Sequence, residues 1–205
     1  MIDHTAVISE LTTLRLFLLC WGCCALAIRT FYARRSARRN ALPDSTFVNP
    51  HPYAVVAVST WILVLALFTA RPDLLQIPGF YTQSVPSVYQ QIVGITGLVL
   101  GLYLLARAHQ ELGEFYGVRL FLKESHETVS TGPYALVRHP MYTAYMVWIL
   151  STLVFVPQVG LALMLPVAWL GFSKMAEVEE NMLTQALGKD YGDYINETGR
   201  FIPWV

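Results

Sequence analysis

The chain has 205 residues, of which 55% are hydrophobic and only 14% are charged. Its mean hydropathy is +0.46, which exceeds what a water-soluble domain usually shows and indicates an integral membrane protein. The formal net charge is zero, and the basic residues do not gather into one folded face. The composition therefore argues against a nucleic-acid-binding surface.

Five apolar runs follow one another along the chain, and we expect each to be a membrane-crossing helix, since about 20 apolar residues span a bilayer. They cover residues 11–31, 53–70, 88–106, 141–156 and 159–173. The sequence thus predicts an all-α, polytopic membrane protein with about five transmembrane helices. Because the last two runs are short, we expect them to draw on flanking residues or to form a tight hairpin that turns at Pro157-Gln158.

The first run lacks the features of a removable signal peptide, because it starts with acidic Asp3 and Glu10 and has no small-residue cleavage site. Its three cysteines, Cys20, Cys23 and Cys24, have no second pair of ligands nearby. They are predicted to be packing residues, with neither a disulfide framework nor a metal site.

The Lys and Arg residues predict the orientation of the passes. If five passes alternate, twelve of the fourteen lie on one side, and only Arg15 and Arg71 lie on the other. Since basic residues favour the cytoplasmic side, we expect the N-terminus outside and the C-terminus in the cytoplasm. The arginine run from Arg34 to Arg39 is then a topology anchor rather than a patch for lipid headgroups or nucleic acid.

Gly94, Gly97 and Gly101 recur at spacings of three and four residues in the third run. Such spacing places small residues on one helix face, where a second helix can approach closely. The packing partner is predicted to lie within one chain or in a second copy, so an oligomer remains open.

Polar residues concentrate between Arg107 and Arg138, in a segment too long for a simple connector. Thr131-Gly132-Pro133 is expected to break the chain, and the residues from Tyr134 to His139 to form a short helical turn that Pro140 ends. His139 and Tyr142 then share a helix face, while Arg138 points elsewhere and is able to pair with a carboxylate.

Lys174 to Leu187 has apolar residues at helical spacing and predicts an amphipathic helix. Gly188 is expected to end it, and a second short element to follow and end before Thr198. The apolar tail from Phe201 is predicted to dock on the membrane surface. The domain division is 1–106 for the first three transmembrane helices and 107–205 for a functional core.

Several nucleotide and hydrolase signatures are missing from the chain. It has no Gly-x-Gly-x-x-Gly after a strand, no phosphate-binding Gly-x-x-x-x-Gly-Lys-Ser/Thr and no Gly-x-Ser-x-Gly nucleophile elbow. A Rossmann-type site and a serine hydrolase are thereby excluded. What remains is a group of His, Tyr and Glu residues beside apolar helices.

From about Arg107 to Pro203 the chain resembles the isoprenylcysteine carboxyl methyltransferases and related phospholipid methyltransferases, which are integral membrane enzymes that use S-adenosylmethionine. Each motif is weak alone, but their order and spacing make the resemblance specific. They are His126-Glu127-Thr128-Val129, Gly132-Pro133-Tyr134, Arg138-His139-Pro140-Met141-Tyr142, Glu179-Glu180-Asn181-Met182-Leu183, Gly188-Lys189-Asp190-Tyr191 and Gly199-Arg200 with Pro203.

The resemblance implies a cytoplasmic cofactor pocket for S-adenosyl-L-methionine, built from the C-terminal half of the chain. It implies as pocket residues His126, Glu127, Thr128, Val129, Tyr134, His139, Pro140, Met141, Tyr142 and Glu179. Arg119 corresponds to a cofactor-contacting position with a different side chain, and Arg138 and Glu180 are expected to hold the fold. Where the carboxyl methyltransferases place an arginine, this chain has Met175 beside Lys174, which departs from the pattern for a prenylcysteine carboxylate substrate.

The expected reaction is methyl transfer to a lipid-like or small membrane-partitioning acceptor, with a carboxylate, amine or thiol as the nucleophile. Positioning of the reactants supplies most of the acceleration in such a transfer, so no catalytic residue is assigned. One alternative is an NADPH-dependent membrane reductase of the sterol-reductase type, which has a similar Arg-His and double-acid pattern. Another is a non-catalytic membrane scaffold protein.

Overall fold

The computed structural model describes residues 4–39, 66, 86–116, 127–155 and 159–204. Within these ranges the regular structure is helical, and the one β-type feature is an isolated parallel bridge between Val137 and Gly199. The expected all-α fold class is therefore confirmed for the described part of the chain. Most of the second apolar run, residues 117–126 and the expected turn at Pro157-Gln158 fall outside the described residues.

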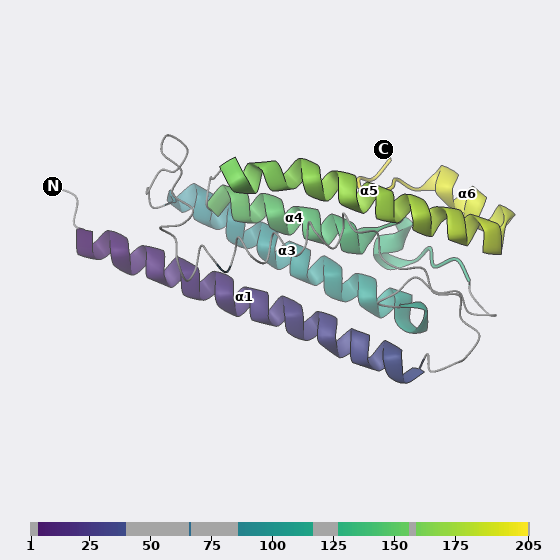
Figure 1. The fold of residues 1–205 in the computed structure, drawn as a ribbon, viewed down its shortest axis with the longest axis horizontal. Coiled ribbons are helices and arrows are strands. Elements are labelled where there is room, and N and C mark those ends of the chain that lie inside the picture. The colour runs from purple at the N-terminus through teal and green to yellow at the C-terminus, as the bar shows by residue number, and fades with distance from the viewer. Residues whose placement is uncertain (1–3, 40–65, 67–85, 117–126, 156–158, 205) are drawn as a thin grey trace.

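Four long helices lie side by side in the order α1, α3, α4 and α5 (Figure 1). Their bounds are His4–Arg39 for α1, Val88–Leu112 for α3, Pro140–Phe155 for α4 and Val159–Leu187 for α5. The C-terminal ends of α1, α3 and α5 and the start of α4 lie at the same end of the bundle. The short helix α6, Lys189–Glu197, packs at this end, which we call the α6 end (Figure 1).

One described helix, α3, is long and apolar enough to cross a membrane, by its length and composition alone. Two shorter apolar helical stretches, Leu16–Tyr32 within α1 and Pro140–Phe155, accompany it. The helix α3 is capped by Ser87, the residue before its first turn. The Ser87 hydroxyl accepts from the backbone N–H of Gln90, and the Gln90 side chain accepts from the backbone N–H of Ser87. This reciprocal cap satisfies two backbone donors at the start of α3.

The glycine face of α3 is confirmed as a packing seam, and its partner is α4 of the same chain. A Cβ atom added at Gly94 would lie 2.6 Å from the Phe155 ring, and one added at Gly101 would lie 2.4 Å from the Trp148 ring. Only glycine therefore permits this close approach of α3 and α4. The helix α1 joins the same core through Trp21, whose ring meets Trp148 edge-on at a centroid distance of 4.5 Å.

The amphipathic segment expected at Lys174 to Leu187 is not a separate helix, because α5 runs without a break from Val159 to Leu187. No glycine or proline interrupts residues 173–187, so nothing in this stretch stops the helix. Gly188 ends it with a φ of +60°, a conformation that favours glycine, and α6 begins at the next residue. The expected end of the last element before Thr198 is confirmed.

Candidate functional site

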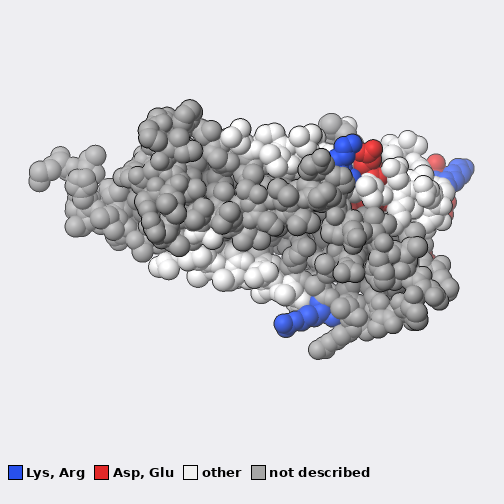
Figure 2. Space-filling model, in the orientation of Figure 1, with Lys and Arg blue, Asp and Glu red and all other residues white. Residues whose placement is uncertain are grey.

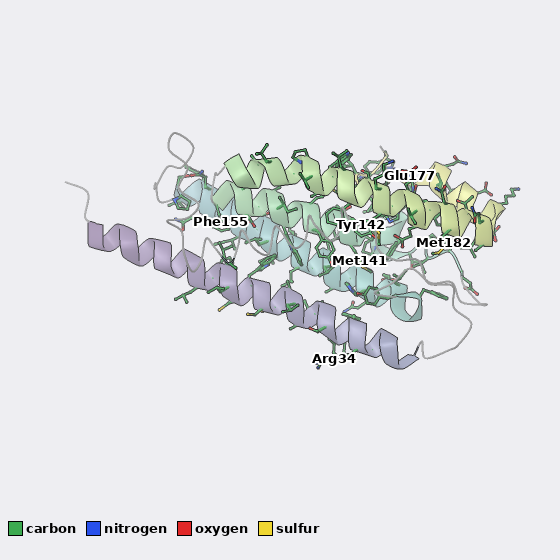
Figure 3. The ribbon with its side chains drawn as sticks, viewed as in Figure 1. Arg34, Met141, Tyr142, Phe155, Glu177 and Met182 are labelled. Carbon is green, nitrogen blue, oxygen red and sulfur yellow. The ribbon has the colours of Figure 1, made fainter. Side chains whose placement is uncertain are left out.

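The candidate site lies at the α6 end of the bundle, where the start of α4 meets the second half of α5. Figure 3 shows Tyr142 of α4 and Glu177 of α5 toward this end, whereas Phe155 marks the opposite end of α4. The charged side chains visible in Figure 2 also lie in the half of the molecule that contains this end, and the other half shows white and undescribed surface. In this view the charged side chains of the described residues are thus confined to the half of the molecule that contains the α6 end.

A short C-terminal segment, residues 198–201, is hydrogen-bonded to the chain that enters α4. The backbone N–H groups of Arg138 and His139 donate to the carbonyls of Gly199 and Arg200 at 2.9 and 3.1 Å. The Thr143 hydroxyl donates to the carbonyl of Phe201 at 2.8 Å. The last residues of the chain therefore fix the backbone of the Arg138-His139 motif.

This pairing changes the helical turn expected from Tyr134 to His139. The structure has a 3-10 turn at Gly132–Ala135, and residues 136–139 are not helical. Val137 instead forms the parallel bridge to Gly199, so the backbone donors of residues 138 and 139 are used between segments rather than within a helix. The turn was expected from Tyr134 to His139, so the expectation placed its start two residues too late and its end four residues too late.

Glu180 joins three basic side chains, and we call Arg138, His139, Glu180 and Arg200 the Glu180 junction. Arg138 Nε lies 2.9 Å and His139 Nε2 3.1 Å from Glu180 Oε1, and Arg200 Nη2 lies 2.5 Å from Oε2. Arg138 also donates to the carbonyls of Ile195 and Thr198. Removing one partner of a buried charge pair such as Arg138–Glu180 costs about 3–5 kcal/mol. The junction joins three segments: the chain that enters α4, the second half of α5 and the C-terminal segment.

The pKa of Glu180 follows from these partners. Burial alone would raise the pKa, but the hydrogen bonds from His139, Arg200 and Arg138 outweigh burial and lower it from 4.5 to about 2. Glu180 is therefore a carboxylate across the physiological pH range. With three donors on it, its role is to organise the junction.

His139 is buried at 5% exposure and has a carboxylate on each ring nitrogen. Nδ1 lies 3.3 Å from Glu179 Oε2, and Nε2 lies 3.1 Å from Glu180 Oε1. Burial would lower the pKa of His139, but hydrogen bonding to Glu179 and Glu180 and their negative charges prevail and raise it above 6.5. The ring stacks on Tyr142 with a centroid distance of 5.4 Å and an interplanar angle of 13°.

Glu179 is half-buried and faces the opposite side of the His139 ring from Glu180. Its Oε2 accepts the Tyr142 hydroxyl at 3.3 Å and lies next to His139 Nδ1. Among the described residues, no hydrogen bond or ion pair involves its second oxygen, Oε1. Tyr142 in turn stacks on Phe172 of α5 at 5.2 Å, so an aromatic row supports the carboxylate from the bundle side.

Tyr134 lies near this group and is tied to α6. Tyr194 donates its hydroxyl to the Tyr134 carbonyl at 2.7 Å, and both rings are buried. Burial, and next the negative charge of Glu179, raise the pKa of the Tyr134 phenol well above 10. Tyr134 is therefore a neutral hydroxyl at any physiological pH and is able to act as a hydrogen-bond donor.

The remaining residues implied by the resemblance are dispersed. Thr128 and Val129 are half-buried and Glu127 is exposed, while Arg119 and His126 fall outside the described residues. Pro140 is buried at the start of α4. Met141 packs against the core of α1, α3 and α4, whereas the neighbouring Tyr142 packs on the α5 side. The structure therefore brings His139, Tyr142 and Glu179 together and directs Met141 away from them.

Lys174 and Met175 also have different surroundings. Lys174 is exposed and pairs with Glu177 at 2.9 Å. Met175 is buried in an apolar cluster with Ile149, Phe172 and Phe201. The position where the resemblance implies an arginine is thus occupied by an apolar side chain within a packed cluster.

Sequence reasoning assigned no site role to Arg200, Tyr194 or Phe201, which the structure places at the junction. Phe201 is 2% exposed and its ring contacts both His139 and Tyr142, so the expected docking of this residue on a membrane surface is wrong. The exposed Ile202 and Trp204 are the apolar residues left at the surface. The Gly199-Arg200 motif was the available signal, because it is one of the motifs that carry the resemblance.

Comparison with known proteins gives the same family as the motifs. Residues 92–185 match the model of the isoprenylcysteine carboxyl methyltransferase (ICMT) family. A protein-S-isoprenylcysteine O-methyltransferase of Tribolium castaneum is 27% identical over 79% of this chain and 56% of its own length. One of Schizosaccharomyces pombe is 31% identical over 65% of this chain and 57% of its own length.

The fold also has a solved counterpart. The structure of a eukaryotic intramembrane Ras methyltransferase, ICMT, matches with a TM-score of 0.56 and 24% identity, over 77% of this chain and 55% of that one. The chain thus spans between half and two thirds of the length of the first relatives it matches. The resemblance carried by the motifs is confirmed: residues 92–185 of this chain are similar to the isoprenylcysteine carboxyl methyltransferase family, and its fold is similar to that of the solved ICMT.

Proposed function

We propose that this chain is an integral membrane methyltransferase that uses S-adenosylmethionine and acts on a lipophilic or membrane-partitioning acceptor. The observation that carries the proposal is the group formed by His139, Tyr142 and Glu179 at the polar end of an apolar bundle. The printed names of the relatives, which are isoprenylcysteine O-methyltransferases, support the reaction class.

The described residues fit the donor and acceptor pattern of S-adenosylmethionine. Glu179 Oε1 is able to accept from an amino or ribose hydroxyl group, because the contacts of this side chain are on Oε2. The Thr128 hydroxyl is buried and has no hydrogen-bond partner among the described residues, so it is available to a bound molecule. We assign these two residues and Tyr134 as the groups that would hold the cofactor.

When bound, the cofactor supplies an electrophilic methyl group on a positively charged sulfur. That charge decreases on the way to the transition state, so an anionic pocket at the sulfur would stabilise the ground state more than the transition state. Neutral aromatic faces such as those of Tyr134 and Tyr142 hold a cation without that penalty. The residues then contribute by orientation, which is worth up to about 7–11 kcal/mol for well-aligned reactants.

The proposal includes five membrane passes with the N-terminus outside and the site in the cytoplasm. It is supported by the directions of the four described long helices, because the C-terminal ends of α1, α3 and α5 and the start of α4 lie together at the α6 end (Figure 1). Arg34 and Arg107 lie in the last turns of α1 and α3, Lys174 lies in the second half of α5, and Arg138 lies just before α4. The side of α3 away from α4 exposes apolar residues, which lipid would cover: Val88, Ile92, Val93, Val99 and Leu100. Introduced cysteines and an impermeant thiol reagent would test the orientation.

The nature of the acceptor is a separate part of the proposal. Arg138 and Arg200 are both engaged by Glu180, and Met175 is apolar, so these three side chains offer no free cation for an acceptor carboxylate. An amine or a thiol is therefore included beside the prenylcysteine carboxylate in the panel that we propose to test. Labelled methyl transfer to prenylcysteines, aminophospholipids and small thiols would identify the class.

The cofactor site is tested by calorimetric titration of the purified protein with S-adenosylhomocysteine. Glu179→Ala is expected to weaken binding by about 10- to 100-fold, since a hydrogen bond to a charged group is worth about 1.5–3 kcal/mol. Glu177→Ala is the matched control, because Glu177 is an exposed carboxylate on the same helix. No heat with the wild type, or equal loss in both variants, would refute the site. Tight binding of NADPH instead would favour a reductase, and cofactor binding without transfer to any acceptor would favour a scaffold.

A further inference from the structure

The environment of His139 is asymmetric in a way that the family resemblance did not predict. Glu180 has two guanidinium partners, Arg138 and Arg200, besides the imidazole. In the described part of the chain, Glu179 has no cationic partner other than the ring of His139. We propose that His139 is an imidazolium that neutralises and orients Glu179, and so is a positioning residue for cofactor binding rather than a cofactor ligand.

The donor and acceptor count supports the charged ring. An ionised carboxylate only accepts hydrogen bonds, and a neutral imidazole has one N–H donor. His139 presents both nitrogens to carboxylate oxygens, Nδ1 at 3.3 Å to Glu179 and Nε2 at 3.1 Å to Glu180. Both nitrogens donate only if the ring carries two protons. A neutral ring would place a lone pair against one carboxylate in a site that is largely shielded from water.

The other groups that face the His139 ring are neutral, or are arginines already bound to Glu180, so they are compatible with a positive charge on the ring. From α4, the neutral Tyr142 stacks on its face, and from the C-terminal segment Phe201 lies at a centroid distance of 6.0 Å. Arg138 precedes the ring in sequence and Arg200 comes from the C-terminal segment, and both are bound to Glu180. The two carboxylates on α5 face the ring directly, so its nearest charged neighbours are anions.

The ring also fixes the direction of Glu179. His139 Nδ1 and the Tyr142 hydroxyl both approach Oε2, at 3.3 Å each. The ring itself is held by the stack on Tyr142, by burial and by the hydrogen bond from its backbone N–H to the Arg200 carbonyl. With both donors on Oε2, the other oxygen of Glu179, Oε1, is left to accept from the cofactor. That Oε1 binds the cofactor rests on the proposed function.

The protonation state is tested without any cofactor. In protein labelled with ¹⁵N-histidine, the two ring nitrogens of His139 are expected to show the imidazolium pattern at pH 7 and to titrate above 6.5. His109 is an internal reference, because it is buried on α3 and its Nδ1 lies 2.8 Å from a backbone carbonyl, that of Leu105. A neutral ring at pH 7, or a titration of His139 at or below 6.5, would overturn the proposal whatever the protein binds.

The positioning role is tested by the pH dependence of cofactor affinity. Affinity for S-adenosylhomocysteine is expected to fall about tenfold as pH rises through the midpoint found for His139, since the cost of a lost charged hydrogen bond is of this order. His139→Gln keeps N–H donors on one nitrogen but carries no charge, and it is expected to bind S-adenosylhomocysteine weakly and without this pH dependence. Glu179→Gln is expected to lower the titration midpoint of His139. The positioning role would be refuted if the titration midpoint of His139 were unchanged in Glu179→Gln. It would also be refuted if the wild-type affinity for S-adenosylhomocysteine did not change over the pH range in which His139 titrates. Absence of binding at every pH would instead refute the proposed function itself.

Discussion

Arg200, in the C-terminal segment, binds Oε2 of Glu180 on α5 at 2.5 Å. Glu180 Oε1 is at the same time bound by Arg138, in the chain that enters α4. One carboxylate therefore links the end of the chain to the entry of α4 and to the second half of α5. The candidate site lies against this link, so its geometry depends on residues that do not line it.

The two arginines at the Glu180 junction are expected to differ in their effect on stability. Arg138 is 9% exposed in its side chain and Arg200 is 38% exposed. Arg138→Ala leaves a buried carboxylate with one fewer partner and is expected to lower the free energy of unfolding by about 3–5 kcal/mol. Arg200→Ala removes a partly solvated pair and is expected to cost about 1 kcal/mol. Thermal unfolding in detergent measures both, and a larger loss for Arg200→Ala would contradict the junction as described.

Much of this fold could be predicted from composition and spacing, because helix length, apolar runs and small-residue faces are local properties of the sequence. The glycine seam at Gly94 and Gly101 and the stop at Gly188 are of this kind. The pairing of Val137 with Gly199 could not be predicted in this way, because it joins residues far apart in sequence and has no repeating pattern. The same reason hid the roles of Arg200 and Phe201 in the candidate site.

Because α3 and α4 pack closely at the glycine face of α3, adding a single methyl group at Gly101 is expected to lower the stability of the protein. Gly101→Ala would place a Cβ atom 2.4 Å from the Trp148 ring, so α3 and α4 must separate or the ring must move. Overpacking of this kind costs about 1–3 kcal/mol. Gly192→Ala in α6 is the control, because nothing lies within 4 Å of an added Cβ there. A midpoint of thermal unfolding that falls equally in both variants would show that the seam does not depend on glycine at this position.

The 3-10 turn before the site lies against the Glu111 side chain of α3. Gly132 has a φ of +58°, and an added Cβ would lie 2.7 Å from the Glu111 side chain, which also accepts the Thr131 hydroxyl at 3.0 Å. Gly132→Ala is therefore expected to weaken cofactor binding by displacing the turn that carries Tyr134. Gly113→Ala is the matched control, because it has a φ of +53° and open space around an added Cβ. Gly113→Ala reproduces the backbone strain without the clash with Glu111, so a difference between the two variants reports on the clash. Equal affinity for S-adenosylhomocysteine in the two variants would exclude a role for Glu111.

Acid is expected to destabilise the protein through Glu180. The pKa of this group falls from 4.5 to about 2 in the folded protein, because the hydrogen bonds from His139, Arg200 and Arg138 outweigh the burial that would raise it. The folded state therefore binds its proton less readily than the unfolded state does, and the contribution of Glu180 is fully present above pH 4.5 and is lost as pH falls toward 2. Glu180→Gln is expected to be less stable at pH 7 and to lose less between pH 5 and 3, which denaturation at a series of pH values would show. A wild-type and a variant curve that run parallel through this range would rule out Glu180 as the titrating group.

The attachment of α6 to the site is tested most directly at Tyr194. Its hydroxyl donates to the Tyr134 carbonyl at 2.7 Å, and the ring is buried beside Tyr191 at a centroid distance of 5.7 Å. Tyr194→Phe keeps the ring but removes the hydroxyl that donates to the Tyr134 carbonyl. Because that carbonyl then loses its donor, the variant is expected to lower the free energy of unfolding by about 1–3 kcal/mol. If the bond also positions Tyr134, cofactor affinity falls in Tyr194→Phe by more than it does in Thr198→Ala, a variant that instead removes the hydroxyl bonded to the Tyr194 carbonyl at 2.6 Å. Equal affinities in the two variants, measured by the same titration, would show that α6 stabilises the bundle end without setting the position of Tyr134.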